Sequence, residues 1–217
     1  DTDRSRGLGD VYKRQVIGMF LGVFAALHKN TIWDTIATVI SVIGVSIPSF
    51  VFAMLILLLF ASKLRLLPTS YSSSNAIKSS IMPILALSVG VIANVARFTR
   101  TEMVSVLTSE YMTLAKAKGL DRKTLIFKHA LRNALIPVIT YLGPQVAFTL
   151  CGGFVVESVF SIPGLGRYFV QSIQNRDYPV IMGTTIFLAT FIILMNLVVD
   201  LLYKVADPRI SLTKGGD

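Results

Sequence analysis

The sequence predicts an all-α integral membrane protein, and three observations support this prediction. The 217 residues are 53% hydrophobic and only 15% charged, with a mean hydropathy of +0.66, which is more apolar than a soluble globular domain needs to be. Uncharged runs recur along the chain at lengths near the roughly 20 residues with which a helix crosses a membrane. The net charge of +9 lies in the connections between these runs, so we expect a helix bundle joined by polar loops.

The positive charge does not indicate a nucleic-acid-binding protein. A basic groove binder spreads its charge over a polar fold, with aromatic residues that stack on bases. The Lys and Arg residues of this chain separate apolar runs instead, and we expect no nucleic-acid partner. The one cysteine, Cys151, lies within an apolar run, which favours a buried thiol and excludes a disulfide framework.

The N-terminal stretch has two parts. Residues 1–15 are polar without helical or strand periodicity, and we interpret them as a non-native or disordered leader. Residues 16–27 are uncharged but too short to cross a membrane. They are either the core of a signal peptide or part of a membrane helix. We favour the partial helix, because no small-residue cleavage site follows before His28.

Residues 35–62 form the first complete uncharged run, and its middle holds Gly44, Ser46, Pro48 and Ser49. Small residues let neighbouring helices approach closely, and a proline frees a carbonyl that neighbours can satisfy. We therefore expect one spanning helix with a kink. The kink is either a packing seam or a bend that lines a translocation path, for which Ser46, Pro48 and Ser49 are the candidates.

Three further spans follow. A polar connection over residues 63–78 precedes the second span, and glycines place the end of the third near Leu150. Residues 155–179 are too polar to span, so we expect them to fold back onto the bundle with a turn at Pro163 and Gly164. The predicted spans after the first are residues 79–96, 133–150 and 178–199.

The distribution of Lys and Arg predicts the orientation. Alternate loops on one side carry twelve of these residues after Gln15, and those on the other side carry five. By the positive-inside rule, the basic loop after residue 96 and the C-terminal tail face the cytoplasm. The serine-rich connection and the fold-back face outward.

The basic loop, about residues 109–136, predicts two short helices that meet near Gly119. Ser109 suits the N-cap of the first helix, Gly119 suits its left-handed end, and Asp121 suits the N-cap of the second. An amphipathic basic segment of this kind either lies on anionic lipid or docks in a protein groove. Small residues such as Ala115 and Ala117 favour docking, since a helix embedded in lipid has bulky apolar residues there.

These residues carry a resemblance to a known family. The loop and four other stretches resemble the permeases of ATP-binding cassette (ABC) transporters in the dipeptide and oligopeptide importer branch, over about residues 16–210. The general permease signature has Glu-Ala-Ala, with a glycine six residues after the Glu. This chain has Thr113 at the acidic position, so contact through a Glu is in doubt. The matching stretches are TLAKAKGLDRKTLIFKHALRNALIPV, VVESVFSIPGLGRYFVQSIQNRDYPV, LVVDLLYKVADPRI, GVSIPSFV and KLRLLP.

The resemblance implies a permease helix bundle over residues 16–217, with four complete transmembrane helices, a partial one at the N-terminus and cytoplasmic coupling helices. It also implies an N-terminally truncated chain. In such permeases the loop's short helix sits in a cleft of a separate cytoplasmic ATP-binding cassette subunit. The implied contact positions in this chain are Ala115, Lys116, Ala117, Gly119, Leu120 and Asp121.

The chain has no G-x-x-x-x-G-K-[ST] phosphate loop, so the resemblance implies that ATP binds the partner. We expect no enzymatic activity, cofactor or metal in this chain. The implied function is import of di- or oligopeptides by alternating access in a bacterial or archaeal cell (inner) membrane. The implied partners are ATP-binding cassette subunits, an external substrate-binding protein, membrane lipid, and a second permease subunit as a homodimer or homologous heterodimer.

Several alternatives remain open. The same branch also carries nickel, glutathione or oligosaccharides, and from a different class the chain is a non-ABC membrane channel or scaffold. Glu157 either lines the translocation path and contacts a peptide amino group, or pairs with Arg167 or Arg176, or is simply hydrated. The sequence shows no Ser-His-Asp set and no H-E-x-x-H motif that would indicate a membrane-embedded enzyme.

Overall fold

The computed structural model describes residues 2–150 and 153–206, and these residues form helices without a strand. The predicted all-α fold is therefore confirmed. Two elements, η1 and η3, are π-helical, and η2 is a 3-10 turn. The N-terminal half contains α1 (Thr2–Leu27), α2 (Ile32–Ser46), α3 (Ser49–Ile56), η1 (Leu57–Lys63), η2 (Ser73–Asn75) and α4 (Ala76–Leu107). The C-terminal half contains α5 (Glu110–Ala117), η3 (Thr124–Ala130), α6 (Leu131–Leu150), α7 (Phe154–Val159), α8 (Leu165–Asn175) and α9 (Tyr178–Ala206).

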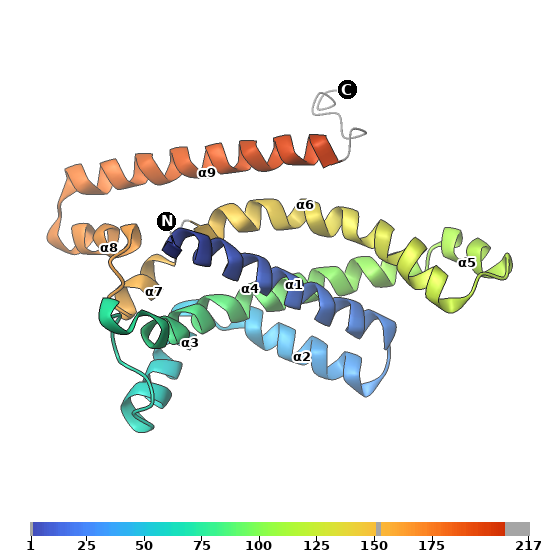
Figure 1. The fold of residues 1–217 in the computed structure, drawn as a ribbon, viewed down its shortest axis with the longest axis horizontal. Coiled ribbons are helices and arrows are strands. Elements are labelled where there is room, and N and C mark those ends of the chain that lie inside the picture. The colour runs from blue at the N-terminus through green and yellow to red at the C-terminus, as the bar shows by residue number, and fades with distance from the viewer. Residues whose placement is uncertain (1, 151–152, 207–217) are drawn as a thin grey trace.

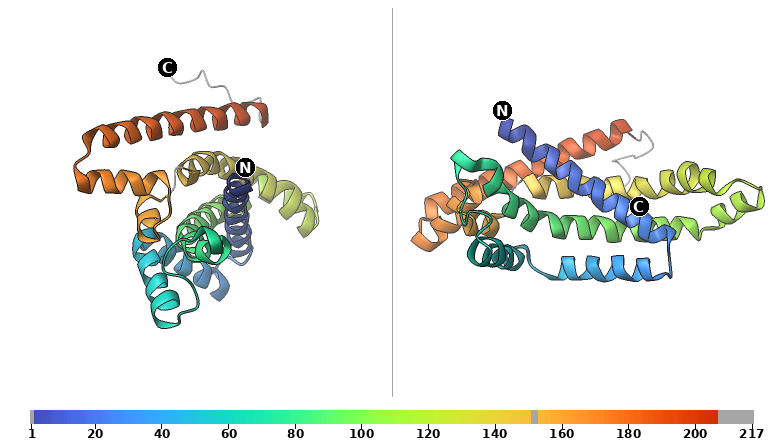
Figure 2. Two further views of the ribbon diagram at one scale, coloured as in Figure 1. Left: turned by 60° about the vertical axis from the view of Figure 1, so that its left-hand side comes forward. Right: turned by 60° about the horizontal axis from the view of Figure 1, so that its bottom comes forward.

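Helix α4 is the central element of the bundle. Its 32 residues correspond to about 48 Å at about 1.5 Å per residue, against about 30 Å for a membrane's hydrocarbon core. Helices α1, α2, α3 and α6 all pack against it (Figures 1 and 2). Helix α4 is therefore long enough to project beyond a membrane. The basic loop, which we predict to face the cytoplasm, follows the C-terminal end of this helix.

Helix α1 approaches α4 so closely that the contact requires glycine. A Cβ atom built at Gly22 would lie 2.5 Å from the carbonyl oxygen of Ala96 and 2.6 Å from the Cβ of Thr99. A Cβ at Gly18 would lie 2.8 Å from the Cβ of Val95. Small residues at such positions let helix backbones pack at short range, which is the common way to hold membrane helices together.

The prediction of one kinked helix over residues 35–62 is wrong. Helix α2 ends at Ser46 and α3 begins at Ser49, and the two are bent by 98°. Proline lacks an N–H group and disfavours helical geometry in the residue before it. Ile47, with φ −84° and ψ 118°, accordingly adopts an extended conformation. The turn lets α3 bury Ala53 and Ile56 against α4 and the fold-back.

The basic loop also differs from its prediction in one respect. Its first helix, α5, is short as expected, but the predicted second short helix is not separate. It is the π-helical η3, which runs directly into α6. Helix α6 is described as far as Leu150, and the predicted helix end at the following glycine pair begins in residues outside the described part of the chain. The loop is thus one short helix and the beginning of a long one.

The predicted fold-back is confirmed. Helices α7 and α8 turn between Val159 and Leu165 and lie at the end of the bundle opposite α5 (Figure 1). Phe160 is almost fully buried against α3 and α4 residues. Its carbonyl oxygen accepts a hydrogen bond from the backbone N–H of Tyr71, at 2.8 Å, which joins the serine-rich connection to the fold-back.

Within the described residues, two helical segments are long and apolar enough to cross a membrane singly, namely Ser73–Leu107 and Tyr178–Val198. The bent pair of α2 with α3 and η1 is a third candidate. Helix α9 contacts α6 and α8, and little of its apolar surface is covered. Helix α1 includes residues 2–15, which we interpret from the sequence as a leader, and continues without a break through residue 16. The predictions for Cys151 and for the C-terminal tail lie outside the described residues.

We predict that Gly22→Leu destabilises the protein by about 1–3 kcal/mol, the usual cost of overpacking a close contact. Gly183→Leu is the matched control, because a Cβ at Gly183 would meet no atom within 4 Å. Thermal unfolding of the detergent-solubilised variants measures the difference. Equal melting temperatures for the two variants would contradict the close packing of α1 on α4.

Candidate functional site

The short helix α5 begins and ends as its sequence predicts. The Ser109 hydroxyl oxygen accepts a hydrogen bond from the Met112 backbone N–H at 3.4 Å, which caps the first turn. Glu110 lies in that turn, where a negative charge is favourable. Gly119 has φ +76°, a left-handed conformation that side chains disfavour. The loop therefore presents a short helix with defined ends.

The segment after Gly119 is fixed by a second cap. The Asp121 carboxylate accepts a hydrogen bond from the Thr124 backbone N–H at 3.1 Å. The Thr124 side chain and the Thr124 backbone N–H both donate hydrogen bonds to the Asp121 carboxylate, and these bonds hold the pKa of Asp121 below its usual value. The bond from the side chain has the larger effect. The predicted N-cap role of Asp121 is confirmed, although the helix it begins is η3 continuing into α6.

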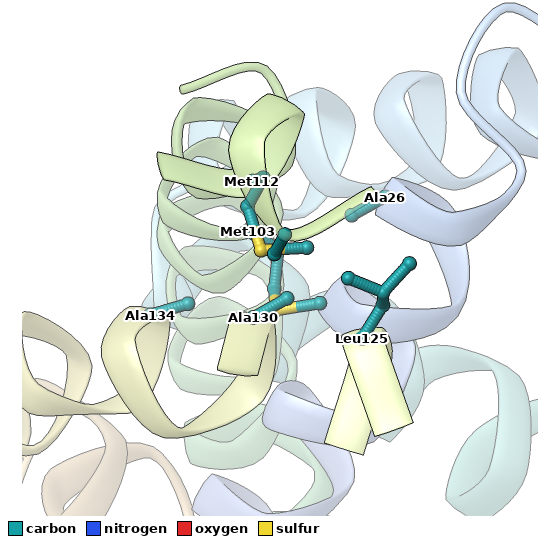
Figure 3. Packing of buried hydrophobic residues seen from close by; sticks show 7 residues of the cluster. Ala26, Met103, Met112, Leu125, Ala130 and Ala134 are labelled. Carbon is teal, nitrogen blue, oxygen red and sulfur yellow. The ribbon is translucent and has the colours of Figure 1, made fainter. Parts of the chain in front are cut away.

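A compact apolar cluster holds α5 against the bundle. Met103 of α4 and Met112 of α5 are fully buried in it, and Leu125 and Ala130 approach from η3 (Figure 3). Ala115 is also buried in this cluster, unlike the other five predicted contact positions, which are exposed. Ala115 therefore anchors α5 to the body of the protein. The complete cluster consists of Ala26, Met103, Met112, Ala115, Leu125, Ala130 and Ala134.

A polar contact supplements this cluster. The Tyr111 hydroxyl lies 2.5 Å from Nδ1 of His129, and the two ring centroids are 5.9 Å apart. This contact joins α5 to η3 near the protein surface, where the Tyr111 side chain is exposed. The short helix is thus attached by apolar packing underneath and by one hydrogen bond at its edge.

The outer surface of the loop carries large apolar side chains among positive charges. Leu114 is 59% exposed and Phe127 is 66% exposed, and Leu120 is also exposed. Sequence reasoning missed Leu114 and Phe127. Leu114 could have been found, because at 100° per residue it lies off the face that Met112 and Ala115 share. The exposed neighbours are Lys116, Ala117, Lys118, Gly119, Asp121, Arg122, Lys123 and Lys128. We call Leu114, Leu120, Phe127 and these neighbours the basic tip.

The break between α2 and α3 opens onto a cavity of about 480 Å³. Pro48 and Ser49 line it, together with residues of α4 and Gln145 of α6. Ser46 is not among the lining residues, and its hydroxyl donates to the Val42 carbonyl oxygen at 2.8 Å. Two of the four predicted path residues therefore lie at one cavity. We call it the break cavity.

Glu157 lies elsewhere, in the fold-back. Its carboxylate accepts a hydrogen bond from the Gly166 backbone N–H at 2.8 Å, at the start of α8. Burial raises the pKa of Glu157, and the backbone N–H groups of Gly166 and Arg167 partly oppose this. A Cβ on Gly164 would collide with the same carboxylate. The glycines of the GLGR sequence therefore leave room for Glu157.

The expected pairing of Glu157 with Arg167 is not what the structure shows. The Arg167 guanidinium donates instead to the carbonyl oxygen of Ser161, at 3.2 Å. The Glu157 carboxylate is directed to backbone groups of α8, and Glu157 is not among the residues that line the break cavity. The four predicted path residues do not converge on one site.

An ion pair that sequence reasoning missed links α2 to α4. The Arg100 guanidinium binds both carboxylate oxygens of Asp34, at 2.5 and 2.7 Å. The Asn30 backbone N–H donates to Asp34 Oδ2 at 3.0 Å. The Asp34 side chain is only 7% exposed. The partners are 66 residues apart, so no local pattern pairs them.

Comparison with known proteins identifies the family. Residues 18–212 match the model of the binding-protein-dependent transport system inner membrane component. The chain belongs to this family. The inferred membership in an ABC-transporter permease family is thereby confirmed, and residues 1–17 lie outside the match.

The chain is similar to curated members of the family. It is 51% identical over 201 residues to the dipeptide transport system permease protein of Bacillus subtilis, covering 93% of this chain and 65% of that protein. It is 44% identical over 195 residues to the oligopeptide transport system permease protein of Haemophilus influenzae, covering 90% and 64%. The chain thus spans just under two thirds of the length of these relatives.

A solved structure supports the fold. The crystal structure of an amino acid ABC transporter with histidines superimposes with a TM-score of 0.63, covering 94% of this chain and 91% of that one. The sequences are 19% identical. The arrangement of helices around α4 is therefore a fold shared with a chain of that transporter.

We predict that Glu157→Gln changes how stability depends on pH. Because burial raises the pKa of Glu157, folding favours its protonated form. That contribution is complete below the unfolded pKa of about 4.3 and is lost as pH rises through the raised value. The variant, which stays neutral, should match the native protein at acid pH and melt higher near neutrality. A native protein that melts higher than the variant near neutrality would contradict this account.

Proposed function

We propose that this chain is the transmembrane permease subunit of an ATP-driven importer for di- or oligopeptides. The basic tip carries the proposal, since it presents exposed apolar side chains on a firmly attached short helix in a member of a transport family. The names of the relatives support a peptide cargo. Nickel, glutathione or an oligosaccharide are the alternative cargoes. Measuring which of these compounds, or which peptides, compete with uptake of a labelled peptide distinguishes them.

The basic tip is the docking surface for a cytoplasmic ATP-binding cassette subunit. Leu114, Leu120 and Phe127 expose apolar surface to water in this chain, and docking of the partner buries that surface. The positive-inside rule, applied to the surrounding lysines and arginines, supports a position of this end of the bundle on the cytoplasmic side of a bacterial or archaeal inner membrane. Lys116, Ala117, Gly119 and Asp121 complete the contact, and Ala115 holds the helix from beneath. ATP is bound by that partner.

The break cavity lies on the route of the cargo. Transporter sites commonly form where a membrane helix is interrupted, because irregular backbone is tolerated where it lines a cavity. Pro48 and Ser49 line such an interruption here. A second permease subunit, identical or homologous, completes the path, and an external binding protein delivers the peptide. Movement of the two permease subunits between outward-open and inward-open states then carries the cargo across.

We predict that Leu114→Gln weakens binding of the ATP-binding cassette subunit about tenfold or more. Burying a leucine contributes about 1.5–3 kcal/mol, and about 1.4 kcal/mol corresponds to a tenfold change in affinity. Leu66→Gln is the matched control, because Leu66 is 65% exposed in the connection after η1 that Tyr71 joins to the fold-back. Co-purification of the ATP-binding subunit and peptide uptake by cells measure the effect.

Gly119→Trp tests the same surface through shape. A tryptophan at this left-handed position should abolish co-purification and uptake while membrane insertion stays intact. Normal uptake in both Leu114→Gln and Gly119→Trp would overturn the proposed docking surface.

A further inference from the structure

The Asp34–Arg100 pair is a polar contact between α2 and α4 in which three hydrogen bonds converge on one carboxylate. The two bonds from Arg100 form the parallel fork that guanidinium and carboxylate groups favour. The third bond, from Asn30, comes from the turn between α1 and α2, where Asn30 has a left-handed φ of 64°. One carboxylate therefore fixes a turn, the start of α2 and the cytoplasmic part of α4.

A second contact joins α2 to α4 further along. A Cβ built at Gly44 would lie 2.9 Å from the Cβ of Ala93 and 3.4 Å from a methyl carbon of Val89. Between this contact and the ion pair, a mostly apolar cavity of about 290 Å³ separates the helices. Helix α2 is thus fastened to α4 at two levels, and the ion pair is the contact on the side of the basic tip.

Helix α4 also carries the two features that the proposed function requires. Seven residues beyond Arg100 it ends at Leu107, and α5 follows after two residues. In the other direction, residues of α4 and of α2 both line the break cavity. They are Ala86, Leu87, Val89, Gly90 and Val91 of α4, and Ile40, Ile43, Gly44 and Val45 of α2. The basic tip and both of these cavity walls are therefore connected through α4.

We propose that Asp34 and Arg100 are positioning residues for transport, which make α2 move as one body with α4 and the basic tip. This inference rests on the proposed function. A displacement of the tip by the ATP-binding subunit then reaches both walls of the break cavity together. Without the pair, α4 moves while the start of α2 stays behind, and ATP hydrolysis is poorly coupled to transport.

Stability alone gives a weak reason for such a pair. Desolvation of two charges offsets much of their attraction, so a well-packed apolar pair often stabilises a protein as much. An oriented fork fixes the relative position of two helices, which apolar contacts across a cavity do not. The pair therefore suits a role in holding α2 and α4 in one register.

The test measures the distance between α2 and α4 directly. Spin labels are placed at Ile36 and Thr101, both exposed, after replacement of the single cysteine by Cys151→Ala. Electron paramagnetic resonance on the solubilised protein then gives the distribution of distances. We expect a narrow distribution in the native background and a clearly broader one in Asp34→Asn. Labels at Phe20 and Thr101, on α1 and α4, form the matched control and should give the same width in both backgrounds.

The second arm measures coupling in the transporter assembled with its partner subunits. Asp34→Asn should lower the peptide transported per ATP hydrolysed by roughly fivefold or more, the lower bound of typical coupling effects. Arg100→Lys, which keeps the charge but not the two-bond fork, should give an intermediate ratio. A role in stability alone would lower transport and hydrolysis in proportion and leave their ratio unchanged.

The outcomes separate the two proposals. An unchanged distance distribution in Asp34→Asn, or an unchanged ratio of transport to hydrolysis, overturns the positioning role. If the native assembly transports no peptide although the variant broadens the distribution, the proposed function fails while the mechanical link between α2 and α4 stands.

Discussion

The close packing of helices on α4 is the constraint on which the rest of the structure depends. Glycine and alanine contacts bring α1 and α2 against this helix, and its 32 residues continue beyond them to the basic tip. In a membrane, helices gain little from the hydrophobic effect on meeting one another, so such short-range contacts and a few polar ones determine their arrangement. The Asp34–Arg100 pair is the polar contact of this kind between α2 and α4.

The two ends of the bundle use different devices to hold irregular chain. At the basic tip, α5 depends on helix caps and on the apolar cluster around Met103 and Met112. At the opposite end, the fold-back depends on Phe160 and on the Glu157 side chain, an oxygen of which accepts from the Gly166 backbone N–H at the start of α8. The side chains of Ser109, Asp121 and Glu157 accept hydrogen bonds from backbone N–H groups that would otherwise be unpaired in an apolar environment. Both ends are therefore held in defined positions against the bundle.

The sequence predicted the local features well and the long-range ones poorly. The caps at Ser109 and Asp121 and the left-handed Gly119 depend only on neighbouring residues. Pro48 and Pro83 both lie within uncharged apolar runs of the sequence. The helix nevertheless breaks at Pro48, whereas α4 continues through Pro83. The difference lies in tertiary packing, since the turn at Pro48 buries α3 against the fold-back. The burial of Ala115 and the partner of Asp34 likewise depend on residues distant in the chain.

The central claim is that the basic tip is the surface on which an ATP-binding cassette subunit docks. The most direct measurement is photo-crosslinking in intact cells, with a photoreactive amino acid at position 114 or, as the control, at position 66. Both leucines are well exposed, but Leu114 lies on α5, whereas Leu66 lies in the connection after η1 that Tyr71 joins to the fold-back. The account predicts a covalent adduct with an ATP-binding subunit from position 114 and none from position 66. Adducts with lipid alone at position 114, or equal adducts at both positions, would contradict it.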